Sequence, residues 1–212
     1  MKETTRVYLK ITLLGLLFMM SLFLGLYVYQ QSIPKTPHLH HATYVGPGRM
    51  LSAFELQKTD AQVLNLSHLV GHWTILFFGY TQCRSICPTT MDMMHHVYDK
   101  LRQDGILQRP EMIMISLDGD RDSLETMRHY VTGFDKEFKG AIGQKSMVQK
   151  LTQELGVVYD SQSDQNDGQI DHSGSLTLIN PAGEVVAFFI PPMQVQDIAQ
   201  DIETLTKTFK IR

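Results

Sequence analysis

Cys83 and Cys87, the two cysteines of the chain, lie four residues apart in the segment FFGYTQCRSICPTTM. An apolar run precedes them and Pro88 follows, which indicates a loop between a buried strand and the first turn of a helix. Two thiols at this spacing can form a disulfide, or their thiolates can hold one soft metal ion. Redox motifs of the CxxC type carry two intervening residues, so the three present here favour metal binding. An inert buried pair is the remaining interpretation, but functional residues concentrate in such loops.

A metal ion held by two thiolates needs a further ligand, and an imidazole would suit copper. Spacing alone leaves open which histidine supplies it. His172 ends the polar loop that begins SQSDQNDGQ and directly precedes a predicted strand, so it can reach the same edge of the sheet as the cysteines. We expect this loop to be mobile without copper and to tighten with it. The other histidines of this region lie on helices away from the cysteines or at the far end of the central strand, and they are His68, His72, His95, His96 and His129.

A sheet must position these two ligand-bearing segments. The alternation in SAFELQ predicts one strand, and the run WTILFFG predicts a central strand that is buried on both faces. EMIMISL predicts another, and SLTLI and EVVAFFI flank the turn NPAG as a hairpin. Apolar residues three to four apart predict helices over about 89–103, 123–132, 145–155 and 195–207. This order of elements predicts an α/β fold with a mixed sheet flanked by helices.

The N-terminal segment predicts a membrane anchor. Residues 11–33 carry no charge, and the apolar core from Ile11 to Tyr29 would span roughly 28 Å as a helix, close to the thickness of the bilayer hydrocarbon. The preceding KETTRVYLK carries three basic residues and one acid, so the positive-inside rule places the N-terminus in the cytoplasm. We therefore expect a single-pass protein of the bacterial inner (cytoplasmic) membrane with its C-terminal domain in the periplasm. A cleaved signal peptide is the alternative, but no small-residue cleavage site follows the run.

The sequence predicts three parts, which are the anchor over 1–30, a juxtamembrane linker over 31–47 and a globular domain over 48–212. The linker contains the cluster HLHH, which could contact a metal, although such tracts are more often solvated tethers. A net charge of −3 gives no basic surface, so nucleic acid is not an expected partner. The 12 methionines and 9 histidines suit copper, but methionine also packs readily into cores.

Five segments together resemble the Sco/SenC family of copper metallochaperones. They occur in the family's order and are FFGYTQCRSICPTTM, SLDGDRDS, YVTGFD, GVVYD and DHSGSLTLINPAGEVVAFF. The resemblance covers roughly Gly48 to Thr208. It implies a thioredoxin-like fold and one copper ion, Cu(I) with Cu(II) as a second candidate state, bound by Cys83, Cys87 and His172. It also implies that Asp118 supports these ligands without touching the metal.

The resemblance further implies a role in building the binuclear CuA centre of cytochrome c oxidase. The chain would act as a copper donor, as a reductant for the receiving cysteines, or as both. Its expected partners are the membrane, the oxidase subunit that carries CuA, and other copper chaperones or thiol reductants. Two rival functions remain, an envelope thiol–disulfide oxidoreductase without a copper role and a peroxidase.

The chain departs from the family pattern at three positions, two of them in the cysteine loop. Arg84 and Ser85 stand where the family more often has proline and aspartate, and Gly119 replaces a proline after Asp118. We expect the helix N-terminus and the positive charge of Arg84 to lower the pKa values of both cysteines. None of these departures removes a predicted ligand.

Overall fold

The computed structural model describes residues 2–32, 37–160 and 168–209. The chain forms two compact units, Met1–Thr36 and Pro37–Arg212. The first unit holds helix α1, Lys2–Ser32, in which the stretch Lys10–Gln30 is long and apolar enough to cross a membrane. Its described side chains are exposed, as expected of a helix whose apolar surface faces lipid rather than protein. The predicted apolar helix is therefore present at the predicted place.

The second unit is built on one mixed sheet, whose described strands follow the order β1-β8-β7-β4-β5-β6-β2-β3. Strand β4 is central, pairing in parallel with β5 and antiparallel with β7. All six residues of β4 are buried, which explains why its sequence is apolar on both faces. The strands are β1 Thr43–Met50, β2 Glu55–Lys58, β3 Val63–Asn65, β4 Thr74–Gly79, β5 Glu111–Ser116, β6 Lys139–Ile142, β7 Leu176–Ile179 and β8 Glu184–Phe189.

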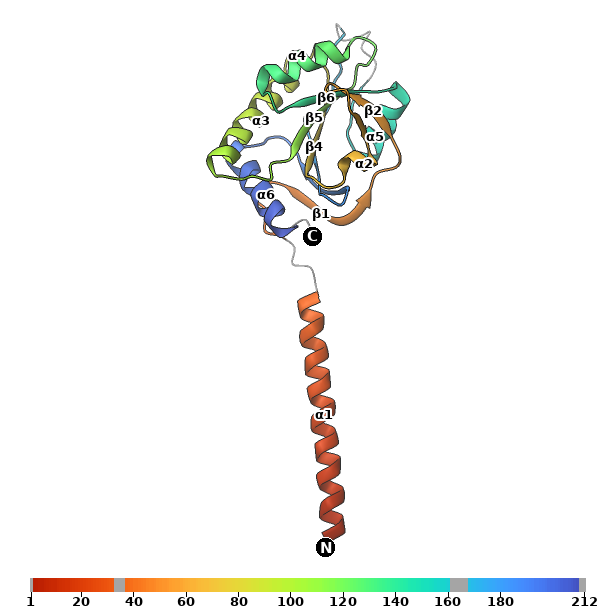
Figure 1. Ribbon diagram of the computed structural model, residues 1–212, viewed down its shortest axis with the longest axis vertical. Helices are drawn as coiled ribbons and strands as arrows, with labels where there is room; N and C mark the ends of the chain where they lie inside the picture. Colours follow the sequence, from red (N-terminus) through yellow and green to blue (C-terminus); the bar gives the residue numbers. More distant parts are fainter. Residues whose placement is uncertain (1, 33–36, 161–167, 210–212) are drawn as a thin grey trace. The chain divides into compact units, whose positions relative to one another are not determined.

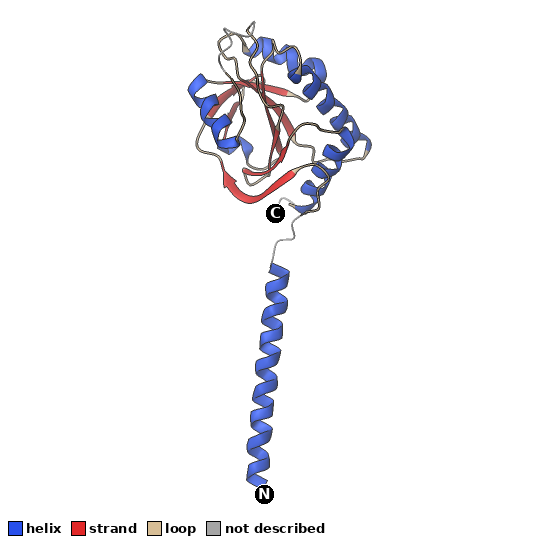
Figure 2. Ribbon diagram, turned by 180° about the vertical axis from the view of Figure 1, so that it is seen from behind, coloured by secondary structure: helices blue, strands red, loops and turns tan. Residues whose placement is uncertain are grey.

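Helices cover both faces of this sheet (Figures 1 and 2). Helices α3 and α6 lie side by side on one face, and α5 lies on the other (Figure 1). The helices of this unit are α2 Leu66–Leu69, α3 Ile86–Gln103, α4 Leu124–Phe134, α5 Lys145–Leu155 and α6 Val195–Thr208. The predicted α/β architecture is confirmed, and the four long helices lie within three residues of their predicted bounds.

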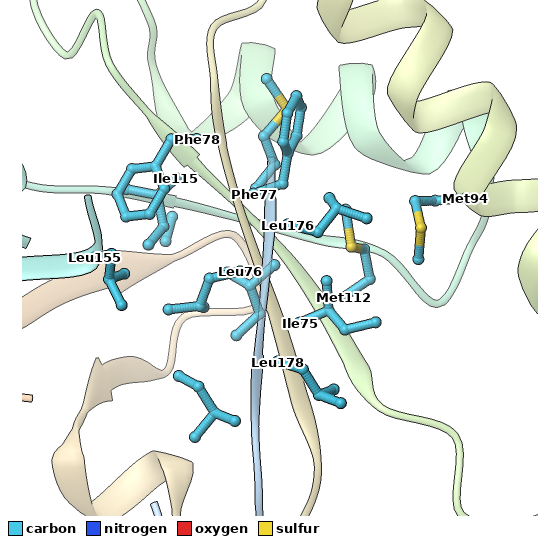
Figure 3. Packing of buried hydrophobic residues seen from close by; sticks show 14 of the residues in the cluster. Ile75, Leu76, Phe77, Phe78, Met94, Met112, Ile115, Leu155, Leu176 and Leu178 are labelled. Carbon is cyan, nitrogen blue, oxygen red and sulfur yellow. The ribbon is translucent and has the colours of Figure 1, made fainter. Parts of the chain in front are cut away.

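The side chains of β4 alternate between two layers of core. Figure 3 shows Ile75 on the side of Met94 from α3, and Leu76 and Phe78 on the side of Leu155 from α5. This alternation follows from the two-residue period of a strand. Because both layers are packed, the ends of β4 are fixed, and so are the loops that leave them.

Three strands of the sheet are not predicted from the sequence. Strand β1 contains two glycines and a proline and pairs with β8 on either side of an irregular register, so its apolar alternation is broken. Strands β3 and β6 have only three and four residues, too few for a periodic pattern to emerge. The segment GVVYD, whose apolar residues suggest a further strand, forms no strand and contributes a single bridge between Tyr159 and His172.

The HLHH segment is attached to the globular unit through its backbone. The N–H groups of His40, His41 and Ala42 donate to the carboxylate of Asp201 at 2.7, 2.8 and 2.7 Å. Asp201 belongs to α6 and is fully buried. The Nε2 atom of His41 also lies 2.7 Å from the carbonyl oxygen of Ile190. Residues 40–42, expected to be part of a solvated tether, are thus bound to α6, and β1 follows directly.

Candidate metal centre

The cysteines lie where β4 ends and α3 begins. Cys83 is half-buried in the loop after Gly79, and Cys87 is the second residue of α3 with no solvent exposure. Helix α3 begins three residues earlier than predicted, so Cys87 is helical whereas Cys83 is not. The N–H of Cys87 points to the sulfur of Cys83 at 3.4 Å, because this sulfur lies beside the open first turn.

His172 is held beside the cysteines by a short antiparallel pairing. Its bridge to Tyr159 and the 2.9 Å hydrogen bond from the N–H of Ser173 to the carbonyl of Val158 fix the backbone. The ring is 7% exposed and lies with its centroid 6.0 Å from those of Phe77 and Tyr80. The loop SQSDQNDGQ, expected to be mobile, falls mostly on residues 161–167, outside the described residues.

The imidazole of His172 presents Nε2 to both sulfurs. Nε2 lies 3.2 Å from Sγ of Cys87 and 3.8 Å from Sγ of Cys83, and the three atoms all lie within 4.8 Å of one another. Nδ1 lies 3.2 Å from the carbonyl oxygen of Ser173, a contact that requires the ring proton on Nδ1. Nε2 then carries a lone pair directed at the cysteines, and burial lowers the pKa of His172 and so favours this neutral form. Metal–sulfur bonds are about 2.3 Å long, so two sulfurs bound to one ion lie at most about 4.6 Å apart. The distances within this cluster are therefore close to those that a shared metal ion requires.

The two thiols differ in acidity. Burial would raise the pKa of Cys83, but hydrogen bonds from the N–H groups of Cys87 and Ser85 outweigh it, and the pKa lies below its usual value. Burial raises the pKa of Cys87 well above its usual value, and the charge of Cys83 adds to this shift. A lowered pKa is therefore found for Cys83, through backbone N–H groups, while the expectation is wrong for Cys87; the effect expected from Arg84 stays a prediction. The N–H groups at the helix N-terminus lower the pKa of Cys83, as expected. At Cys87 the effect of burial on the pKa is larger than that of the helix N-terminus.

A buried carboxylate that has no recognisable signal in the sequence lies close to the cysteine loop. Asp122 accepts hydrogen bonds from the N–H of Thr81 at 3.2 Å and from the hydroxyl of Ser116 at 2.6 Å. Its charge also contributes to the raised pKa of Cys87. Asp118 instead accepts from Arg121, whose other nitrogen donates to the carbonyl of Gly168 at 2.7 Å. Asp118 is thereby connected to the segment that leads to His172.

Tyr80 and Gln169 join the two ligand-bearing loops. The Tyr80 hydroxyl accepts from the N–H of Ile170 at 2.9 Å and donates to Oε1 of Gln169 at 3.1 Å. The same Oε1 accepts from the N–H of Arg84 at 3.3 Å, and Nε2 of Gln169 donates to the carbonyl of Gln82 at 3.3 Å. These contacts hold the segment before His172 against the cysteine loop. No local pattern predicts them, because the partners are more than 80 residues apart.

Gly79 leaves room for the sulfur of Cys87. A methyl group at this position would lie 2.7 Å from Sγ of Cys87 and 2.9 Å from Cε of Met114. We expect Gly79→Ala to displace the sulfur, to destabilise the fold by about 1–3 kcal/mol through overpacking, and to weaken metal binding. Urea unfolding and a copper titration measure the two effects. Gly133→Ala is the matched control, because nothing lies within 4 Å of its methyl group; equal behaviour of the two variants would contradict the packing argument.

Comparison with known proteins places the chain in a family. The SCO1/SenC sequence profile matches residues 43–207. An SCO2-like protein of Rickettsia prowazekii is 28% identical over 193 residues, 87% of this chain and 93% of that protein. The structure of Bradyrhizobium japonicum ScoI with copper bound is 26% identical with a TM-score of 0.63, covering 73% of this chain and 98% of that one. BsSco, described as a member of the Sco family of cytochrome c oxidase assembly proteins with a disulfide switch, is 19% identical with a TM-score of 0.62, covering 82% and 97%. The fold is the thioredoxin-like fold expected from the sequence, and the chain belongs to the SCO1/SenC family.

Proposed function

We propose that the chain is a copper metallochaperone that serves the assembly of the CuA centre of cytochrome c oxidase. Cys83, Cys87 and His172 would hold one copper ion as cargo. The convergence of two sulfurs and one imidazole nitrogen within 4.8 Å is the observation that carries this proposal. It is supported by ScoI of Bradyrhizobium japonicum, a relative with copper bound, and by the description of the Sco family as oxidase assembly proteins.

The ligand set suits Cu(I), which is soft and accepts thiolate together with imidazole. Cu(II) is a second candidate state, because imidazole also suits it. Asp118 and Asp122 would act from outside the ligand set by holding the loops that carry it. Because the copper would sit on the half-buried Cys83, a partner's thiolates can approach it from that side. Copper would then pass to those thiolates as its bonds to the chaperone are replaced.

Thiol chemistry at the same pair offers a second role, and the unequal acidity of the cysteines favours it. The thiolate of Cys83, with its lowered pKa, would attack one sulfur of a target disulfide and release the other target sulfur as a thiolate. The thiol of Cys87 would lose its proton and attack the sulfur of Cys83 in the mixed disulfide. The target then leaves with both sulfurs reduced, and the chain holds a Cys83–Cys87 disulfide. Such a disulfide removes both thiolate ligands, so copper affinity would depend on redox state.

The N-terminal helix would keep this chemistry at a membrane. Its apolar stretch Lys10–Gln30 can span the bilayer, and the basic residues that precede it favour a cytoplasmic N-terminus. The copper-binding unit would then lie on the periplasmic side of a bacterial inner membrane, where the CuA-bearing subunit of the oxidase would be the partner. Other copper chaperones or thiol reductants would load or reduce the pair.

Copper loading under controlled redox conditions tests the proposal. The full chain in detergent, reduced and supplied with Cu(I), should hold one copper ion per chain, whereas the chain oxidised to the disulfide should hold none. The copper-loaded chain should then transfer its metal to the reduced apo form of the CuA-bearing subunit. If the reduced chain holds no copper but still reduces disulfides in that subunit, the oxidoreductase alternative is correct and the chaperone proposal fails.

A further inference from the structure

A second group of possible metal ligands lies at the opposite end of the sheet from the cysteines. His68 belongs to α2, His72 lies between α2 and β4, and Glu111 is the first residue of β5. Glu111 is paired with Thr74 at the start of β4, whereas the cysteine loop leaves the other end of β4 after Gly79. Five residues of strand separate the two ends, about 17 Å. The second histidine cluster, defined as His68, His72 and Glu111, is therefore separate from the proposed copper centre.

The three side chains of this cluster direct their donor atoms to one place. Nε2 of His68 and Nε2 of His72 lie 2.8 and 3.3 Å from the same carboxylate oxygen, Oε2 of Glu111. All three atoms lie within 4.8 Å of one another. The two rings are nearly perpendicular, at 80°, with centroids 5.2 Å apart. Two imidazoles and one carboxylate form the ligand set of zinc sites that keep a fourth position open.

No placement of protons turns every contact of the second histidine cluster into a hydrogen bond. Nζ of Lys58 lies 3.0 Å from Nε2 of His68, and an ammonium group only donates, so this contact requires a lone pair on Nε2. The ionised Glu111 only accepts, so its 2.8 Å contact with the same Nε2 requires a proton there. One nitrogen cannot meet both requirements. His72 adds to the conflict, because its Nε2 is buried and makes no hydrogen bond among the described residues.

The charges around the cluster leave room for a cation. Nζ of Lys58 contacts Oδ2 of Asp60 at 3.2 Å and Oε1 of Glu111 at 2.6 Å, so Asp60 balances the lysine. One lysine faces two carboxylates here, so the three groups together carry one net negative charge when all are ionised. The side chain of His72 is 39% exposed, so the cluster lies close to the surface although Nε2 itself is buried.

We propose that His68, His72 and Glu111 form a second metal site for a divalent transition cation such as Zn²⁺. A cation between the three atoms accepts a lone pair from each, so Nε2 of His68 needs no proton and His72 gains a partner. Lys58 then loses its contact with His68 but keeps the carboxylates of Asp60 and Glu111 as acceptors. Oε1 of Glu111 stays with Lys58. The site has no sulfur ligand, so it would favour Zn²⁺ or Cu²⁺ over Cu(I). Because the ligands come from α2, the following turn and β5, the ion would cross-link these segments and stabilise the fold.

Zinc binding to a chain whose copper centre is disabled tests this site. The parent is the full chain in detergent with Cys83→Ser, Cys87→Ser and His172→Ala, and Zn²⁺ affinity is measured by equilibrium dialysis against a competing chelator. We expect one Zn²⁺ per chain and a melting temperature that rises with Zn²⁺ concentration. His72→Ala and the nearly isosteric Glu111→Gln should each lower the affinity at least about 10-fold. A parent that binds no Zn²⁺ would overturn the proposal.

The matched control is His96→Ala, from the group His95, His96 and Asp99 on α3. That group also brings three donor atoms within 4.8 Å, but Arg102 lies 2.7 Å from its Asp99. We expect His96→Ala to leave Zn²⁺ affinity within about twofold of the parent. If His96→Ala removes Zn²⁺ while His72→Ala and Glu111→Gln do not, the ion binds elsewhere and the assignment is wrong. Circular dichroism without metal verifies that each variant is folded. If His72→Ala does not fold, the affinity of Glu111→Gln alone decides the result.

Discussion

Replacing His172 with alanine should weaken Cu(I) binding by the reduced chain at least about 100-fold. Loss of a residue that merely supports a ligand typically lowers metal affinity 10- to 100-fold, and His172 would itself be a ligand. Its Nε2 lies within 4 Å of both sulfurs, and no other histidine of the described residues shares a cluster of possible ligands with the cysteines. Competition with a colorimetric Cu(I) chelator measures the affinity. Two thiolates alone should retain weak binding, so the expected result is a shift and not a complete loss.

His129→Ala is the control for the His172 variant. The side chain of His129 is 72% exposed on α4 and pairs with Glu125, far from any predicted ligand in sequence. Its replacement should leave Cu(I) affinity unchanged. Thiol titration and circular dichroism of the His172 variant verify that the cysteines are reduced and that the fold is intact. Wild-type affinity and stoichiometry in a folded His172→Ala chain would show that this histidine is not a ligand.

The residues of the candidate site could be found from the sequence because each lies at the end of a recognisable element. The run WTILFFG fixes the end of the central strand, and the cysteines follow it directly. The hairpin of β7 and β8 is equally clear from its turn, and His172 precedes it. Since β7 runs antiparallel to β4, the residue before β7 must lie near the end of β4. The sequence alone leaves open which histidine joins the cysteines, and the family resemblance singles out His172. The pairing of β7 with β4, a contact between distant parts of the sequence, then brings this histidine to them.

The residues that surround the candidate ligands could not be predicted from the sequence. Asp122, Tyr80 and Gln169 act through contacts with residues distant in the sequence, and polar residues in loops give no periodic signal. The raised pKa of Cys87 depends on its complete burial in the first turn of α3, which the residue type does not reveal. The sequence also places His68 and His72 at the end of the strand opposite the cysteines, which is correct. It does not bring Glu111 to them, because this contact depends on the register of β4 with β5.

Removing the carboxylate of Asp201 should destabilise the globular unit by about 3–5 kcal/mol. Asp201 is fully buried and accepts three backbone N–H groups, from His40, His41 and Ala42. Hydrogen bonds to a charged group contribute about 1.5–3 kcal/mol each, and Asp201→Ala would leave these donors without an acceptor. The loss of stability should be smaller than the sum of the three hydrogen-bond energies, because the released segment can turn its N–H groups to water. Asp201→Asn should have an intermediate effect, since it keeps one acceptor oxygen but loses the charge.

Urea unfolding of the full chain in detergent measures this effect. Trp73 is the single tryptophan and is buried, with its ring centroid 6.3 Å from that of Phe209, so its fluorescence reports the packing beside α6. Glu203→Gln is the matched control on the same helix, where an exposed pair with Lys207 should contribute no more than about 1 kcal/mol. If Asp201→Ala unfolds at the same urea concentration as Glu203→Gln, the carboxylate does not stabilise the fold. In that case the segment before β1 is held by other contacts, such as the one between His41 and Ile190.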